Sequence, residues 1–461
     1  MKRWLLVIAA LLLVVVAGGY FVARSALASE LARRQLEQQL SAQLGQPVRI
    51  GSLAAKIFPG IAVDLGDVSI GDPAALRIDR IRIFTGIRAL FGDTIDIRRI
   101  DVANGRPGDA APVAFDLAAS VLGDRLDVES LVLRGPTTRV EAKGTLTSIA
   151  NLQGEFDAES KAMDLSELIA IAAALSPKSA GSSKKSATPM HLVLRLKAAT
   201  VRFDQDQLRD LSATIDTVPG RVVLNDLAAG LFGGTFKGKL EADTRTAAPV
   251  VRLTGAMTGL DVAELLKRTG SAGGVTGRLA GRLALVAEGS DAASLTHSAR
   301  GTIDATISNG TLPHLDVVRT VVLAFGKPSG EAPEGSGTAF DTLGGTFALA
   351  AGTLRSENLS LRSRDVDTDG RGALKVASGA VDARADVTLS KELTAQAGTD
   401  LRRYAQQDGR VVVPATLGGT LGQPSVSIDV VAAARRAFGN EVKRRVGDFI
   451  GGLFKKKKGG G

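Results

Sequence analysis

The chain has 461 residues, a formal net charge of +9, 44% apolar residues and no cysteine. This length predicts about three domain-sized units, and the apolar share predicts a folded chain. The missing cysteines exclude disulfides and every zinc site that needs sulfur. Aromatic residues make up only 4% of the chain, which disfavours stacking platforms for single-stranded nucleic acid.

The positive charge is concentrated at the two ends of the chain. Residues 1–34 carry +4 and residues 432–461 carry +7, which leaves −2 for the remainder. Basic ends on a near-neutral body indicate contact with membrane surfaces more than with a nucleic acid. We therefore expect no nucleic acid partner.

Residues 4–22 form an uncharged, apolar run of 19 residues. A helix of this length spans the roughly 30 Å of bilayer hydrocarbon, which predicts a membrane anchor over residues 1–28. Lys2 and Arg3 precede the run and predict a cytoplasmic N-terminus, with the rest of the chain on the far side of the membrane. A cleaved signal peptide is the alternative, because small residues at 26–28 precede Ser29.

The pattern of the remaining chain predicts one helix followed by many strands. Leucines at near-helical spacing predict an amphipathic helix over residues 30–44, ended by Gly45. Short alternating runs then follow, for example over residues 77–84, 192–203 and 381–389. With so few large aromatic side chains to fill a thick core, we expect a mainly β fold: an elongated antiparallel sheet folded into an apolar groove, between an N-terminal transmembrane helix and a C-terminal amphipathic helix.

Two segments interrupt the strand pattern in the same way. Asp164 and Asp261 each follow a strand-like run, and each is followed three residues later by a glutamate, Glu167 or Glu264. An aspartate at this place favours an N-cap, and the glutamate a variant of the capping box. The sequence therefore predicts a unit of one strand and one short helix that occurs twice.

No segment of the sequence carries a recognisable catalytic motif. The histidines His191, His297 and His314 stand far apart, which disfavours a histidine-based metal site. Residues 365–370 copy the first half of an EF-hand loop, but its twelfth position is Val376 instead of a glutamate, so a strand with outward carboxylates is the favoured interpretation. We expect no enzyme activity, no catalytic residue, no cofactor and no metal.

The C-terminal segment, residues 430–461, combines an apolar stripe with many basic residues and predicts a basic amphipathic helix. Such a helix suits an anionic membrane surface, although a tail packed on the end of the sheet is the alternative. The candidate membrane-contacting residues are Arg435, Arg436, Phe438, Lys443, Arg444, Arg445, Phe449, Lys455, Lys456, Lys457 and Lys458.

Several segments in a fixed order resemble the AsmA family of bacterial envelope proteins. They include Gly45–Leu53, Phe58–Ile61 and Leu65–Gly71 near the start, and Glu288–Leu312 and Val413–Pro424 farther on. The resemblance implies a protein anchored in the inner membrane by residues 4–22, single-pass, with its body in the periplasm, and similar to bridge-like proteins that pass lipids across the envelope. The chain is short for such a bridge, so the resemblance does not establish that it spans the periplasm alone.

The resemblance also orders the chain into regions. It implies an AsmA-like N-terminal β region and an AsmA-like C-terminal β region on either side of a central β-groove region. The full expected series is a membrane anchor (1–28), the N-terminal β region (29–175), a linker (176–189), the central region (190–325), a loop (326–338), the C-terminal β region (339–429) and the basic tail (430–461).

The leading hypothesis is a lipid-binding or lipid-transferring protein that supports outer-membrane homeostasis, with phospholipid acyl chains as its partners and a second membrane or envelope protein at its tail. Strand alternation gives the candidate groove residues Leu192, Leu194, Leu196, Phe203, Phe236, Leu240, Ile303, Phe347, Leu359 and Leu361. The alternative is a structural or assembly factor that affects outer-membrane protein insertion without carrying lipid. An envelope carbohydrate-active enzyme is a third hypothesis.

Overall fold

The computed structural model describes residues 30–44, 46–56, 61–72, 75–85, 97–108, 113–168, 189–203, 205–246, 248–268, 273–317, 320, 337–396 and 406–429. The predicted anchor and basic tail, and most of the predicted linker and loop, lie outside these residues. Within them, no helix is both long enough and apolar enough to cross a membrane. The chain divides into two compact units, Met1–Gly230 and Leu231–Gly461, while the region boundaries expected from the sequence stay predictions.

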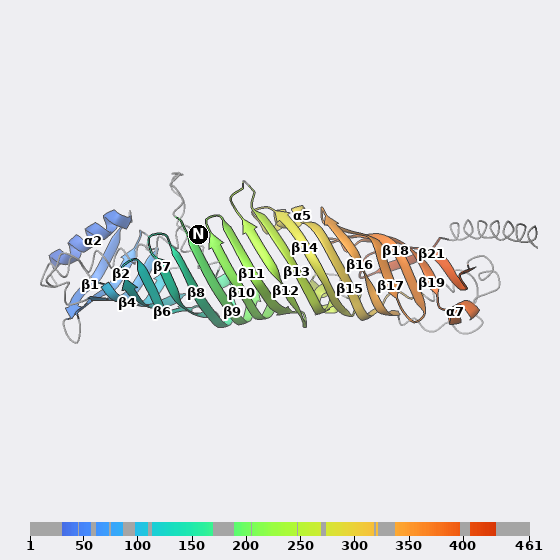
Figure 1. The fold of residues 1–461 in the computed structure, drawn as a ribbon, viewed down its shortest axis with the longest axis horizontal. Helices are drawn as coiled ribbons and strands as arrows, with labels where there is room; N and C mark the ends of the chain where they lie inside the picture. The colour runs from blue at the N-terminus through green and yellow to red at the C-terminus, as the bar shows by residue number, and fades with distance from the viewer. Residues whose placement is uncertain are drawn as a thin grey trace, which may run out of the picture. The chain divides into compact units, whose positions relative to one another are not determined.

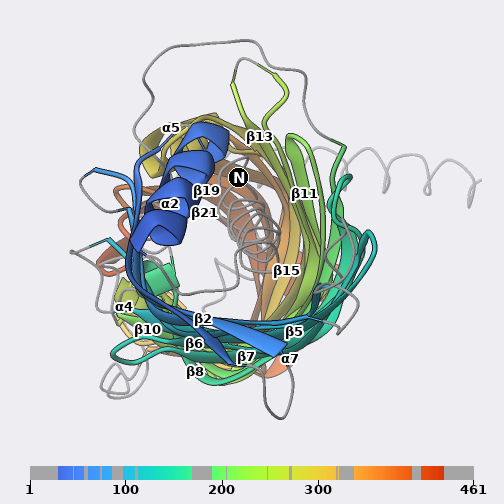
Figure 2. The ribbon, with the colours of Figure 1, turned by 90° about the vertical axis from the view of Figure 1, so that its left-hand side faces the viewer.

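In the described part of the first unit, a helix precedes strands that lie side by side in chain order (Figure 1). Its elements are α2 (Glu30–Leu44), β1 (Val48–Lys56), β2 (Ile61–Ile70), β3 (Leu76–Thr85), β4 (Ile97–Pro107), β5 (Ala114–Leu122), β6 (Arg125–Arg134), β7 (Arg139–Ser148), β8 (Gln153–Asp164), β9 (His191–Phe203), β10 (Asp206–Val218) and β11 (Arg221–Leu231). In Figure 2 the blue to green strands follow an arc instead of a flat layer.

The second unit repeats this arrangement with short helices between some strands. Its elements are β12 (Gly234–Asp243), β13 (Val250–Asp261), α4 (Val262–Arg268), β14 (Arg278–Glu288), α5 (Ala292–Ser298), β15 (Arg300–Leu312), β16 (Thr338–Ala350), β17 (Thr353–Arg362), β18 (Val366–Lys375), β19 (Val381–Leu389), α7 (Lys391–Gln396), β20 (Gln406–Gln407), β21 (Arg410–Gly419) and β22 (Pro424–Ile428). The mainly β fold and the predicted helix over residues 30–44 are confirmed, as are strands over 77–84, 192–203 and 381–389.

The sheet of each unit is open and almost entirely antiparallel. Within each unit the described strands pair with their neighbours along the chain, except that β19 pairs with β21 instead of the two-residue β20, and no described pairing joins the first strand of a unit to its last. One pair departs from the expected antiparallel sheet, because β9 runs parallel to β8. A parallel pair needs a crossover connection, and residues 165–190 supply one, so a purely antiparallel sheet is wrong at this place.

Each sheet forms a single layer over most of its length. In the described part of the chain, the strands contact their ladder neighbours and a few short helices, and no second sheet lies over them. A β-sandwich would bury its inner face between two sheets. In this protein, helix α2 covers part of the apolar face of the first unit, and a second buried cluster encloses part of the apolar face of the second unit.

In the first unit, helix α2 covers the start of the apolar face. Leu36 and Leu40 are 1% and 0% exposed and join a cluster with Ile50, Leu65 and Ile81 from β1 to β3. The hydrophobic contacts of this cluster explain why an amphipathic helix precedes the first strand. In the second unit a comparable cluster extends over β16 to β19 and β21 and includes Val262 at the start of α4.

Several strands bend where one residue adopts a left-handed backbone conformation. Asp67 in β2 has φ of 52°, and the residues on either side of the bend, Leu65 and Val68, are both buried although three positions apart. Asp210 in β10 has φ of 49°. Aspartate and asparagine tolerate this conformation better than most residues. Consequently the side chains that face the apolar side change from odd to even positions within one strand.

Candidate functional site

An unbroken row of apolar residues crosses ten strands of the first unit. Each member is directly opposite the next in the pairing of neighbouring strands. This set, which we call the first row, is Val63, Ile83, Ile100, Ala119, Val128, Gly144, Phe156, Leu194, Ile215 and Leu224. Because paired residues share a face, the row defines the apolar side of the sheet from β2 to β11.

Burial changes along the first row. Val63 and Ile83 lie in the cluster under α2 and are 1% and 0% exposed. From Gly144 onward, every member is only half-buried, including Phe156 and Leu194. The half-buried side chains are shielded by their neighbours in the sheet, and Phe156 also packs against the buried cluster under α2. One continuous apolar surface is therefore a closed core at its start and, from β7 to β11, a half-buried face that is partly exposed to solvent, which we call the uncovered face.

The second unit has a longer uncovered stretch. Eight residues in directly paired positions of β12 to β19 are all half-buried and include no ionisable side chain. This second row is Leu240, Leu253, Leu285, Gly301, Leu349, Leu354, Leu374 and Val381. Eight strands at a spacing of about 4.8 Å give a track of roughly 34 Å, longer than an extended acyl chain.

Aromatic rings fill the hollows that glycines leave on the apolar faces. A Cβ atom built on Gly144 would come within 2.7 Å of Phe156 Cδ1, and one on Gly255 within 2.5 Å of Phe236 Cζ. Both rings therefore lie over a glycine of the neighbouring strand instead of standing upright. This arrangement makes the uncovered surface level.

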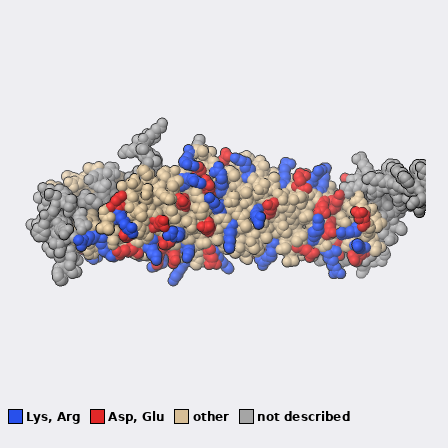
Figure 3. Space-filling model, viewed as in Figure 1, with Lys and Arg blue, Asp and Glu red and all other residues tan. Residues whose placement is uncertain are grey.

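The opposite face of each sheet is polar. Arg195, beside Leu194, binds the carboxylates of Glu155 and Asp157 at 3.1 Å and 2.9 Å. Arg134 hydrogen-bonds Asp116 and lowers the pKa of that carboxyl below its ordinary value, an effect that burial opposes. On the face seen in Figure 3, basic and acidic side chains alternate, so the described residues there form a mixed surface with no single-sign stripe. Water wets this face and leaves the apolar face as the candidate site.

Eight of the ten candidate groove residues lie half-buried on the apolar faces, three in the first unit and five in the second. Leu192, Leu194 and Leu196 alternate along β9, and all are half-buried. The five in the second unit share one face by their strand pairing and are also half-buried, namely Phe236, Leu240, Ile303, Phe347 and Leu359. Lipid binding at these residues stays a prediction.

The other two candidates have different surroundings. Leu361 is 4% exposed and lies inside the covered cluster of the second unit. Phe203 is the last residue of β9 and is 51% exposed. Val201, two positions earlier, is buried in a cluster with Ala198, and these two residues are three positions apart, so β9 also changes the parity of its inward side. Phe203 thus stands at the end of the strand, outside the rows.

Sequence reasoning missed several residues of the uncovered face. Phe156, Ile215 and Leu224 complete the first row, and Leu253 and Leu285 complete the start of the second. The alternation of Leu279, Leu283 and Leu285 with small or basic residues was a usable signal for β14.

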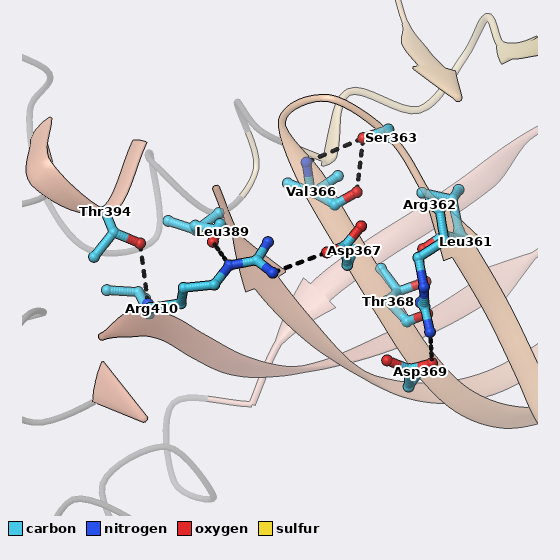
Figure 4. Close-up of polar contacts among 11 residues, drawn as sticks. Leu361, Arg362, Ser363, Val366, Asp367, Thr368, Asp369, Leu389, Thr394 and Arg410 are labelled. Atoms are coloured by element: carbon cyan, nitrogen blue, oxygen red, sulfur yellow. Dashed lines mark hydrogen bonds and ion pairs between the residues drawn. The ribbon is translucent and has the colours of Figure 1, made fainter. Parts of the chain in front are cut away.

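The half EF-hand segment is part of a strand. Asp367 and Asp369 lie in β18, where Asp367 binds Arg410 at 3.0 Å and Asp369 binds Arg362 (Figure 4). Both carboxylates therefore have basic partners, and within the residues described no group of acidic or histidine side chains could hold a metal ion. The favoured interpretation of this segment as a strand is confirmed.

The predicted aspartate caps are also confirmed. Asp164 accepts hydrogen bonds from the backbone nitrogens of Ser166 and Glu167, and Asp261 does the same for Ala263 and Glu264. A capping box would have the side chains of Glu167 and Glu264 accept a hydrogen bond from the backbone nitrogen of the capping aspartate. Both side chains make different contacts.

The carboxylate of Glu167 accepts hydrogen bonds from Thr137 and Thr138 at the turn between β6 and β7. Burial raises the pKa of this carboxyl, but these hydrogen bonds outweigh it and place the pKa below its ordinary value. Glu264 instead pairs with Lys267 at 2.6 Å.

These features define a class of single-layer β protein with an uncovered apolar face in each unit. The model of the AsmA family matches residues 170–359, which end within β17, and this match supports the resemblance found in the sequence. Comparison with curated proteins and with solved structures gave no match.

Proposed function

We propose that the protein binds lipid acyl chains along its uncovered apolar faces and transfers lipid between envelope membranes. The observation that carries the proposal is the second row, eight paired apolar positions that no described element covers. A continuous apolar surface of this extent that is only half-buried is costly in water and marks a surface for an apolar ligand. An acyl chain contributes about 0.8 kcal/mol for each CH₂ that leaves water, so a chain of a dozen carbons binds without any polar partner.

The match to the AsmA family model and the sequence support the following cellular setting for this proposal. Residues 4–22 anchor the chain in the inner membrane, the body lies in the periplasm, and the basic tail meets a second membrane or an envelope protein. The single layer favours lipid carriage over a purely structural role, because a structural sheet would bury its apolar side against its own side chains.

A transfer assay tests the proposal on the full chain. Donor vesicles carry the protein and a fluorescent phospholipid, and arrival of the fluorophore in acceptor vesicles is measured. We expect Leu285→Asp to slow transfer at least fivefold, because a charge on the row repels acyl chains. Ala284→Asp is the matched control, since Ala284 is the adjacent, exposed residue on the opposite face of β14. Equal transfer by both variants, or none by the unmodified protein, would contradict the proposal.

A further inference from the structure

At the start of the first unit, helix α2 covers both the apolar face of the sheet and the backbone edge of β1. On the face itself, Leu36 and Leu40 are buried against the first three strands. At the edge of the sheet, α2 also occupies the backbone groups of β1. Glu37 Oε1 accepts a 2.7 Å hydrogen bond from Ile50 N, Arg33 Nη1 donates a 2.6 Å hydrogen bond to Ile50 O, and Ser41 Oγ accepts from Val48 N at 2.8 Å.

Contact of one helix with both the face and the edge of a sheet differs from the ordinary packing of a helix on a sheet. The edge of a sheet offers unpaired backbone groups that invite another strand, and side chains of α2 bind those of β1. The hydrogen bonds that involve charged groups are the stronger kind, and they fix the helix along the edge. Both the apolar face and the edge of the sheet are thus closed by the same fifteen-residue helix.

We infer that α2 acts as a fixed plug, which means that it permanently closes the start of the apolar face in the first unit. Lipid then enters this unit from the side, at β7 to β11, and not past α2 at the end of the sheet. This inference rests on the proposed function. A lipid that slid along the first row toward its start would have to displace Leu36 and Leu40 from Ile83 and its neighbours. Complete burial of these side chains opposes that displacement, whereas the half-buried members from Gly144 onward are already accessible.

The absence of cysteine makes the test direct. Ser41→Cys and Arg49→Cys place one thiol on α2 and one on β1, where Arg49 is exposed beside Val48, and a short bis-maleimide joins them. A photoreactive diazirine amino acid at position 194 or 83 then reports lipid adducts by mass spectrometry of the full chain in membranes. We expect the tethered and untethered proteins to give equal adduct yields at position 194 and none at position 83.

A second variant tests the same closure by α2 without a tether. The double substitution Leu36→Ser and Leu40→Ser loosens the plug, and we expect adducts to appear at position 83 while those at position 194 persist. Adducts at position 83 in the protein that retains Ser41 and Arg49, or a severalfold loss at position 194 on tethering, would overturn the plug. Absence of adducts at position 194 in every form would instead overturn the proposed function.

Discussion

The two ends of the first row have the same sequence character and opposite surroundings. Ile83 and Ile100 are covered by α2 and its cluster, whereas Leu194 and Ile215 are uncovered although they continue the same line of paired residues. Apolar side chains alone therefore do not distinguish a core from a binding face. A core differs from a binding face in being covered by another element, and in this unit that element is helix α2.

The largest effect expected from this comparison is on stability. Ile83→Ala removes a fully buried side chain and should cost about 2–5 kcal/mol of unfolding free energy. Leu194→Ala removes a half-buried side chain and should cost roughly 1 kcal/mol, because part of its surface is already in water. Thermal or urea unfolding of both variants measures the difference. Equal losses would mean that the uncovered end is packed in solution.

A glycine marks the place on the first row where cover ends. A Cβ on Gly144 would lie 2.2 Å from the carbonyl oxygen of Glu155 on β8, in addition to its clash with Phe156. Gly144→Ala should therefore cost about 1–3 kcal/mol, because the two strands must separate. The control is Ala142→Gly, two positions along β7, which removes a methyl group and should cost about 1 kcal/mol. A neutral Gly144→Ala would show that the strands are not this close.

The crossover beside the uncovered strands depends on a helix cap. Asp164→Ala removes the acceptor of two backbone hydrogen bonds and should cost about 1 kcal/mol, while Asp164→Asn should retain most of that stability. Asp261→Ala, the counterpart in the second unit, should show a loss of the same size in unfolding measurements. Equal stabilities of the alanine and asparagine variants would argue against a capping role.

The smallest expected effect is a pH dependence at the same crossover. The pKa of Glu167 is lowered in the folded protein from the ordinary value of 4.5, so its stabilising contribution is present above that value and is lost as the pH falls through the folded pKa. The difference in melting temperature between the unmodified protein and Glu167→Gln should therefore be larger at pH 7 than at pH 3. A difference that stays constant with pH would remove this role of the carboxylate.

Hydrophobic periodicity predicted the helix over residues 30–44 and the β class of the body, because both have a strong local signal. It could not predict the parallel pair of β8 and β9, since the direction of a strand depends on a crossover that the local pattern does not encode. Nor could it follow the apolar side past bends such as Asp67, where the parity of inward residues changes. Leu361 shows a further limit, because cover by distant residues decides whether an inward leucine is core or surface.

Quenching by lipids brominated on their acyl chains tests the central claim most directly. In the cysteine-free chain, single substitutions Leu285→Cys and Ala284→Cys carry a fluorescent label on opposite faces of β14. The full protein is loaded with brominated or ordinary phospholipid, and the fluorescence of each variant is compared. We predict strong quenching at position 285 and little at position 284. Equal quenching at the two positions, or none at position 285, would contradict lipid binding on the apolar face.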